Sequence, residues 1–168
     1  DLINSYKCTC ETGYYGSNCD SQTPPCPTSE PNYHLIDNKC YFFENTTTPW
    51  EKAKEGCKNK FPVGGKLFEP MTLAENKLVY NVAKPIFNLQ TYGAWIGVTD
   101  ASQEGSFNYD SNDSPVSLNI PWYGVPYGGT WNGKGGTSKN CILVHEDPGK
   151  WMDNDCSYSC YSICEPNV

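Results

Sequence analysis

Residues 94–100 have the sequence AWIGVTD, and residues 141–147 have the sequence CILVHED. Each contains a short apolar run of the kind that forms a buried strand. Residues 101–140, which lie between them, are rich in glycine, proline, asparagine, serine and aromatic side chains, and they lack a helical period. A loop of that length inside a compact domain is usually functional. The two runs therefore predict core strands separated by a long binding loop.

Upstream of these strands, the sequence predicts a hairpin and a first helix. HLIDNKCYFF, residues 34–43, is typical of a strand followed by a hairpin. TPW, residues 48–50, is a typical helix start, with threonine as the N-cap and proline at the first helical position, and Glu51 lies in the first turn. We expect this helix to end at about Lys60.

A second helix is predicted to begin near Thr72, where Thr72 and Glu75 form a capping box. The pattern stops before Pro85, because proline cannot continue a helix. The helix carries an apolar stripe that we expect to face the core, made of Leu73, Leu78, Val79 and Val82.

The composition predicts a disulfide-rich, secreted protein with one main domain. The 168 residues include ten cysteines, an even number, and these are not arranged in CxxC pairs. The two histidines, His34 and His145, have no such pair nearby, so structural zinc is not expected. No apolar run approaches the roughly 20 residues that cross a bilayer. Asp1 opens directly into a polar segment without a signal-like stretch, as expected of a processed, soluble product.

The charges and motifs exclude several function classes. The net charge is -7 and all twelve basic residues are lysines, so the bidentate arginine fork that suits phosphate is absent and nucleic acid is not an expected partner. Neither HExxH nor GxSxG occurs, so we expect no enzymatic activity. The sequon that begins at Asn45 predicts a glycosylation site, which suits a secreted glycoprotein.

The N-terminal stretch differs in character from the rest of the chain. Residues 8–19, CTCETGYYGSNC, resemble the C-terminal half of an EGF-like module, which ends in CxC, a glycine-aromatic-x-glycine turn and a further cysteine. Such a fragment buries too little surface to fold alone. We expect a partial EGF-like hairpin at residues 1–20, a linker at 21–25 and the main domain at 26–168.

The main domain resembles a long-form C-type lectin-like domain. The resemblance rests on spaced motifs: Trp95-Ile96-Gly97, Glu104-Gly105, Trp122, Pro126, Asn140-Cys141, Trp151, Asp153, Cys156 and Ile163-Cys164-Glu165. It implies an α+β fold in which two helices lie beside two small antiparallel sheets and a long loop carries the binding sites.

The two resemblances also imply disulfides between Cys26 and Cys40, Cys57 and Cys164, Cys141 and Cys156, and Cys10 and Cys19. Cys8 and Cys160 remain. The EGF-like pattern would pair the first of these with an upstream cysteine that this sequence lacks, and the second is additional to the lectin-like framework. We therefore predict a Cys8–Cys160 bridge that staples the N-terminal fragment to the main domain.

The lectin-like resemblance implies a principal calcium position, and most of its ligands are missing here. Sugar-binding members use oxygen side chains on both sides of a cis-proline, a glutamate two residues before the next cysteine, and an asparagine-aspartate pair after a tryptophan. The matching positions hold Val125 and Tyr127 around Pro126, then Lys139, Met152 and Asp153. Calcium takes about six to eight oxygen ligands, so we do not expect it at this position.

Calcium remains a weak expectation at an auxiliary position, where the resemblance places Asp100 and Glu104. Its other contributors fall on Gly128 and Lys139, which bring no carboxylate. Solvated loop carboxylates are the alternative for this pair. We also hypothesise that Lys139 places its ammonium near Asp153 and so substitutes for the ion at the principal position.

These features predict an extracellular recognition protein without catalytic chemistry. Its candidate ligand-binding residues are Tyr123, Tyr127, Trp131, Asn132, Lys139 and Asp153. A glycan would bind there by ring stacking and hydrogen bonds, largely without calcium. A protein ligand is the alternative, because aromatic side chains with a polar rim are also typical of protein interfaces. Trp122 is expected to pack rather than to bind, and the sequence leaves the oligomeric state open.

Overall fold

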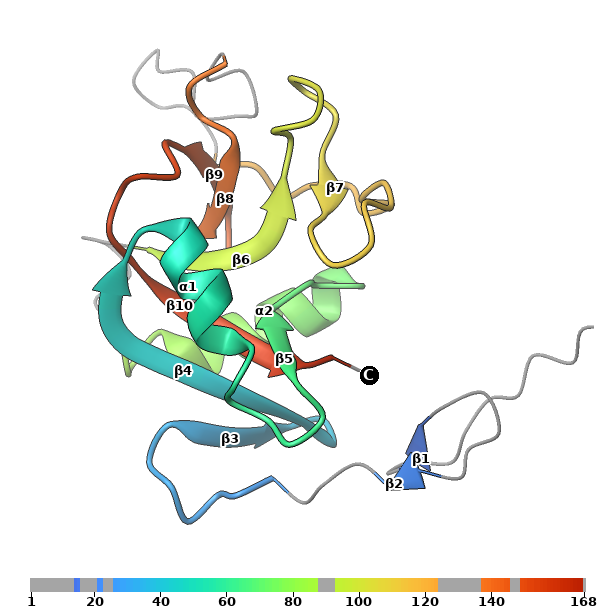
Figure 1. Cartoon of the computed structure of the whole chain (residues 1–168), viewed down its shortest axis with the longest axis vertical. Helices are drawn as coiled ribbons and strands as arrows, with labels where there is room; N and C mark the ends of the chain where they lie inside the picture. Colours follow the sequence, from blue (N-terminus) through green and yellow to red (C-terminus); the bar gives the residue numbers. More distant parts are fainter. Residues whose placement is uncertain are drawn as a thin grey trace, which may run out of the picture.

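The computed structural model describes residues 14–15, 21–22, 26–87, 93–123, 137–145 and 149–167 (Figure 1). The elements in chain order are β1 (Tyr14–Tyr15), β2 (Ser21–Gln22), β3 (Tyr33–Ile36), β4 (Lys39–Thr48), α1 (Trp50–Cys57), β5 (Gly65–Leu67), α2 (Leu73–Ala83), β6 (Ala94–Thr99), β7 (Asn108–Tyr109), β8 (Cys141–Val144), β9 (Trp151–Asn154) and β10 (Cys160–Pro166).

The predicted hairpin is formed by β3 and β4. Its tight turn is Asp37-Asn38, and both residues have positive φ, at 47° and 63°. Two consecutive left-handed residues make the turn type that matches the natural twist of a hairpin, and aspartate and asparagine tolerate that conformation better than most residues. The turn brings Ile36 opposite Lys39 and fixes the register of the pair.

Strand β10 holds the sheet together. Within the described residues the sheet order is β3-β4-β10-β6-β8-β9, with β5 added to β10 and β7 added to β6. β10 pairs antiparallel with β4 and β5 and parallel with β6. The antiparallel ladders are therefore joined into one sheet through the last strand of the domain, as Figure 1 shows.

The sheet separates two apolar clusters, and each helix covers one of them. Alternation along β4 sends Tyr41 and Phe43 into the cluster beneath α2, whereas Cys40 and Phe42 join the cluster beneath α1. In Figure 1, α1 lies in front of the sheet and α2 lies behind it. The α+β arrangement with two flanking helices is the predicted one.

Helix α1 differs from the prediction at both ends. Its N-cap is Pro49 instead of Thr48, without a side-chain cap, and its last residue is Cys57 instead of Lys60. The helix start is fixed by tertiary contacts, since the indole N–H of Trp50 donates to the Ile96 carbonyl at 3.0 Å. Packing thus replaces the local cap that threonine was expected to supply.

Helix α2 has the predicted cap but a different buried face. The Thr72 hydroxyl accepts the Glu75 N–H at 3.0 Å, and the Glu75 carboxylate accepts the Met71 N–H at 2.8 Å. Leu73 and Leu78 are 46% and 45% exposed, so the predicted stripe is wrong at these two positions. The buried residues of the helix are Asn76, Val79, Tyr80 and Ala83, which follow a regular helical spacing.

Three disulfides implied by the resemblance are present: Cys26–Cys40, Cys57–Cys164 and Cys141–Cys156. The predicted Cys8–Cys160 bridge is wrong for this structure, because Cys160 is a free thiol with 0% exposure. Its side chain belongs to the apolar cluster beneath α1, and burial raises the pKa of the thiol to about 12. Cys8 and the predicted Cys10–Cys19 pair lie outside the described residues.

Of the N-terminal segment, the structure describes the two short strands β1 and β2. They pair antiparallel, with Tyr14 opposite Gln22 and Tyr15 opposite Ser21. The EGF-like assignment of residues 1–20 and the linker at 21–25 stay predictions.

Candidate functional site

Residues 121–123 of the predicted binding loop lie beside β9. The Trp151 N–H donates to the Pro121 carbonyl at 3.0 Å, and the Tyr123 N–H donates to the Trp151 carbonyl at 2.9 Å. Trp122 sits between these bonds and forms an isolated parallel bridge with Trp151. These bonds hold residues 121–123, the root of the loop, against β9.

Trp122 anchors this root by packing. Its ring meets Phe107 edge to face at a centroid distance of 4.9 Å, and the half-buried side chain contacts the cluster beneath α2. The predicted scaffold role of Trp122 is confirmed.

Tyr123 is the candidate ligand-binding aromatic that the structure describes. Its half-buried ring meets His145 edge to face at 5.6 Å, and it also contacts the cluster beneath α1. His145 follows β8 directly, as expected for a residue at a strand end. The backbone N–H of His145 donates to the Lys150 carbonyl at 2.9 Å. Three other candidates, Tyr127, Trp131 and Asn132, lie outside the described residues, as does Pro126.

The principal calcium position does not have the side chains that a calcium ion needs. Met152, where the resemblance expects asparagine, is 9% exposed and belongs to the cluster beneath α1. Asp153 is 1% exposed in β9, opposite Ile142 of β8. Lys139, half-buried just before β8, brings a cation instead of a carboxylate. A buried thioether and an ammonium group do not fit a hard divalent cation that prefers oxygen ligands.

Asp100 closes the loop that follows β6. One carboxylate oxygen, Oδ2, accepts the Gly105 N–H at 2.8 Å, while Oδ1 is buried and accepts no hydrogen bond from the described residues. Burial raises the pKa of Asp100 and the charge of Asp153 adds to the rise, although the Gly105 N–H opposes it. The side chain therefore stabilises a turn and carries an unfavourable buried charge.

Of the predicted auxiliary pair, Asp100 is buried beside a residue of the principal position, and calcium binding by the pair stays a prediction. Asp100 feels the charge of Asp153, and its N–H donates to the Asn140 carbonyl at 3.3 Å, so the ends of β6 and β8 meet there. Glu104, in contrast, is exposed. In the ranges that the structure describes, no three histidine, cysteine or acidic side chains lie close enough together to hold a metal ion.

A buried charge network that the sequence reasoning missed supports the framework of the domain. Glu165, the last residue of the ICE motif, is 1% exposed and pairs with Lys39 at 2.6 Å. Lys39 also pairs with Glu75 at 3.0 Å, which links β4 and β10 to α2. Burial raises the pKa of Glu165 even though Lys39 opposes the rise. The sequence does contain a signal for this network, namely an acidic residue inside an apolar strand. Such residues are rarely buried unless they are paired, so a buried ion pair could have been predicted.

The Lectin C-type domain family matches residues 46–166 of this chain. Hepatic lectin from Gallus gallus is 27% identical over 150 residues, which cover 89% of this chain and 65% of that protein. C-type lectin domain family 3 member A homolog from Xenopus laevis is 33% identical over 132 residues, which cover 77% of this chain and 61% of that protein. The chain thus spans less than two thirds of the length of either relative.

A solved structure agrees with these sequence matches. The C-type lectin CEL-I from Cucumaria echinata superimposes with a TM-score of 0.64 at 24% identity, over 80% of this chain and 94% of that chain. The described sheet centred on β10 and its two flanking helices are therefore the framework of a known fold. This chain belongs to the C-type lectin domain family.

Proposed function

We propose that the protein is an extracellular recognition module that binds a glycan through its long-loop surface, largely without calcium. The supporting observation is the structure at the root of the loop. Aromatic side chains are held there by the backbone bonds to Trp151, while Met152 and Lys139 occupy positions where calcium ligands would be needed. Ring stacking and hydrogen bonds then carry the recognition of the sugar.

Each candidate residue has a distinct role in this proposal. Tyr123 and Tyr127 contact the sugar through their rings or hydroxyl groups, and Trp131 provides the ring face on which the sugar stacks. Asn132 bonds sugar hydroxyls, because its amide both donates and accepts. Lys139 and Asp153 are proposed to form a charge pair that replaces the principal ion.

Secretion, glycosylation at Asn45 and an EGF-like extension belong to the same proposal. Asn45 is exposed on β4, where a glycan chain can project into solvent. The three disulfides suit an oxidising compartment. Among the helices that the structure describes, none has the length and apolar character to cross a bilayer.

A glycan array tests the proposal when it is probed with and without a calcium chelator. We expect sugar signals that persist in chelator and that fall about twofold to tenfold in Trp131→Ala, as expected when one stacked ring is lost. Tyr158→Ala is the matched control, because Tyr158 is an aromatic residue that is 58% exposed outside the long loop. Signals that vanish in chelator, or that survive Trp131→Ala unchanged, would contradict the proposal.

Protein binding is the second candidate function, and exposed apolar side chains favour it. Most of the large ones lie on or near β3 and α2, namely Leu35, Met71, Leu73, Leu78 and Ile86, which are 57%, 57%, 46%, 45% and 41% exposed. Exposed non-polar side chains also occur in protein contact surfaces. A blank array from correctly folded protein would favour this function over glycan binding.

A further inference from the structure

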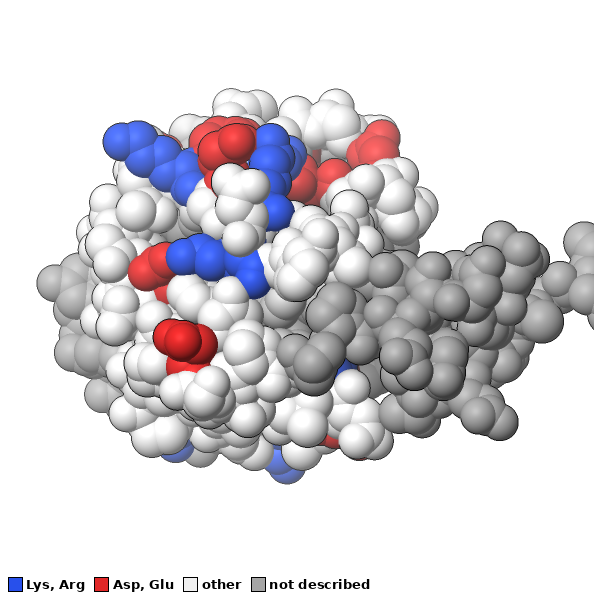
Figure 2. Space-filling view, turned by 60° about the horizontal axis from the view of Figure 1, so that its bottom comes forward, with Lys and Arg blue, Asp and Glu red and all other residues white. Residues whose placement is uncertain are grey.

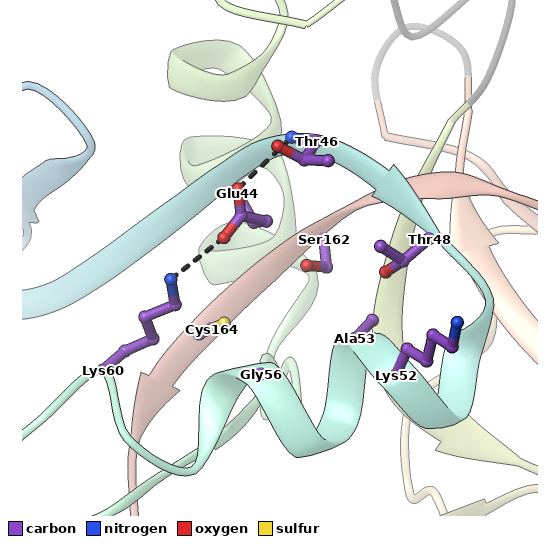
Figure 3. Close-up of a pocket in the computed structure, with 9 residues that line it drawn as sticks. All are labelled: Glu44, Thr46, Thr48, Lys52, Ala53, Gly56, Lys60, Ser162 and Cys164. Carbon is purple, nitrogen blue, oxygen red and sulfur yellow. Dashed lines mark hydrogen bonds and ion pairs between the residues drawn. The ribbon is translucent and has the colours of Figure 1, made fainter.

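A pocket of about 270 Å³ lies between β4, β10 and α1, away from the long loop (Figure 3). It is lined by Glu44, Thr46, Thr48, Lys52, Ala53, Gly56, Lys60, Ser162 and Cys164. At about 30 Å³ per water molecule, it has room for about nine waters, which is the scale of a single-ring ligand. In the sheet order, β6 and β8 separate β10 from β9, where the long loop is rooted.

An irregularity in strand pairing widens this site. Cys160 lies opposite Thr48, but Ser162 lies opposite Glu44, so the segment between Glu44 and Thr48 has two more residues than the segment that faces it. The extra residues bulge, and β4 cannot follow β10 closely there. The wall formed by helix α1 includes the small residues Ala53 and Gly56, with Lys52 at one end of the pocket. The bulge and the small residues together leave the space that Figure 3 shows.

The polar groups of the pocket suit a polyhydroxylated ligand. Thr46 and Thr48 each carry a hydroxyl group that can donate and accept, and Ser162, which is 1% exposed, lies at the floor of the pocket. The Glu44 carboxylate binds Lys60 at 2.9 Å and accepts the Thr46 N–H at 3.3 Å. A carboxylate has about four lone-pair sites, so it retains acceptor capacity for ligand hydroxyls.

The charges of the pocket favour an acidic ligand with one negative charge. Residues 51–66 include five lysines and two glutamates, although the whole chain carries -7. Most of these lysines have acidic partners, and Figure 2 shows lysine and acidic side chains interspersed on one face of the molecule. Lys52 makes no ion pair with any residue that the structure describes, and Figure 3 shows it at the opposite end of the pocket from Lys60.

We propose that this pocket binds a sugar acid of monosaccharide size, such as a uronic acid, independently of the long loop. The ligand carboxylate pairs with Lys52, and its hydroxyls bond to Glu44, Thr46 and Thr48. The carbon face of the ring lies against Ala53, Gly56 and the Cys57–Cys164 disulfide. A phosphate group fits less well, because a second negative charge would be repelled by Glu44.

A titration with sodium glucuronate, followed by the amide signals of the protein in NMR spectra, tests this site. Glucose is the neutral probe of matched ring size. The chain should carry Asn45→Gln, so that a glycan attached at the sequon is not the source of bound sugar. We expect saturable shifts at Thr46, Thr48, Ala53 and Gly56, with a dissociation constant in the range of about 1–10 mM, and weaker binding of glucose.

Two substitutions separate the parts of the proposal. Gly56→Leu should abolish binding by filling the pocket, and a side chain there is tolerated because a Cβ on Gly56 meets no atom within 4 Å. Lys52→Gln should raise the dissociation constant for glucuronate about threefold to fivefold and leave that for glucose unchanged, as for a partly exposed ion pair. Lys58→Gln is the matched control, since Lys58 is exposed and lies outside this pocket.

Several results would overturn the proposal. They are the absence of saturable shifts up to about 50 mM glucuronate, shifts confined to the long-loop region, and binding that survives Gly56→Leu. If Gly56→Leu disturbs the fold, Thr48→Val removes one hydroxyl at nearly constant volume, and unchanged affinity in that variant would count against the assigned contacts. Equal loss of affinity in Lys52→Gln and Lys58→Gln would exclude a specific role for Lys52.

Discussion

Asp100 directly follows strand β6, and its buried carboxylate accepts a backbone hydrogen bond but has lost most of its contact with water. Its Oδ2 accepts the Gly105 N–H, but the residue is only 2% exposed and the Asp153 charge is nearby. The folded protein therefore holds the charged form of Asp100 less favourably than the unfolded chain does. Such a group destabilises the fold at neutral pH unless a cation or a proton compensates it.

We expect Asp100→Asn to increase the free energy of unfolding at pH 7 when calcium is removed by chelator. The pKa of Asp100 is raised in the folded state, so the wild-type protein gains stability as the pH falls through that folded value toward the ordinary carboxyl pKa. The asparagine variant lacks this gain in stability. The difference in free energy of unfolding between the variant and the wild type should therefore shrink between pH 7 and pH 4. Urea unfolding at several pH values measures the difference.

Glu104→Gln is the control for this experiment, because it makes the same carboxylate-to-amide change at an exposed position of the same loop. A difference between wild type and Asp100→Asn that stays constant with pH would contradict the assigned electrostatics.

Helix α2 is positioned by a polar residue, and this explains why its buried face differs from its apolar stripe. The Asn76 side chain donates to the Gly149 carbonyl at 2.8 Å and accepts the Trp151 indole N–H at 2.9 Å. Gly149 has a φ of 91°, and a Cβ on it would lie 2.9 Å from the Asn76 amide nitrogen, so glycine is required for this close approach. The helix is thus bonded directly to the strand that holds the root of the long loop.

Asn76→Ala should lower the free energy of unfolding by about 2–4 kcal/mol, because it leaves a buried N–H and a buried carbonyl without partners. Leu78→Ala is the matched control on the same helix and should change it by less than about 0.5 kcal/mol, since Leu78 is 45% exposed. Urea unfolding of both variants measures the two effects. If Leu78→Ala were the more costly change, the buried face described for α2 would be wrong.

Local signals predicted the elements better than they predicted the faces of those elements. The Asp37-Asn38 hairpin and the Thr72 cap depend on neighbouring residues, so the sequence was sufficient for them. The exposure of Leu73 and Leu78, the burial of Asn76 and the free thiol of Cys160 depend on contacts with distant segments, which hydrophobic periodicity does not contain. The candidate site was predicted through spaced motifs, and only Tyr123, Lys139 and Asp153 of its six residues fall in the described part.

At the scale of the molecule, β10 and its disulfide connect the beginning, middle and end of the domain. The strand pairs with β4, β5 and β6, and Cys164 within it is bonded to Cys57 of α1, 107 residues away in sequence. Closing a loop of this size contributes about 4.7 kcal/mol in the chain-entropy picture, against about 3 kcal/mol for the short Cys26–Cys40 loop. A framework closed in this way can keep its fold while the side chains at the calcium positions change.

Calcium should therefore have little effect on the stability of the whole protein. A ligand that binds only the folded state raises stability by RT ln(1 + L/Kd), where L is the free ligand concentration, so calcium at about 100 times its dissociation constant would add about 2.7 kcal/mol. For a chain of this length, that increment corresponds to a rise of about 5–10 °C in the melting temperature. Because Lys139 and Met152 do not supply oxygen ligands, we expect a shift below about 1 °C at millimolar calcium. Calorimetry with calcium, and with magnesium at the same ionic strength as the control, measures it.

The same melting experiment distinguishes the principal calcium position from the auxiliary one. A rise of several degrees with calcium alone would contradict the proposed loss of calcium dependence. If Asp100→Asn abolished that rise, the ion would be assigned to the auxiliary position, where Asp100 is buried near Asp153 and binding would relieve the buried negative charge. If the rise survived Asp100→Asn but disappeared in Asp153→Asn, the principal position would still bind calcium, and the proposed replacement of the ion by Lys139 would be wrong.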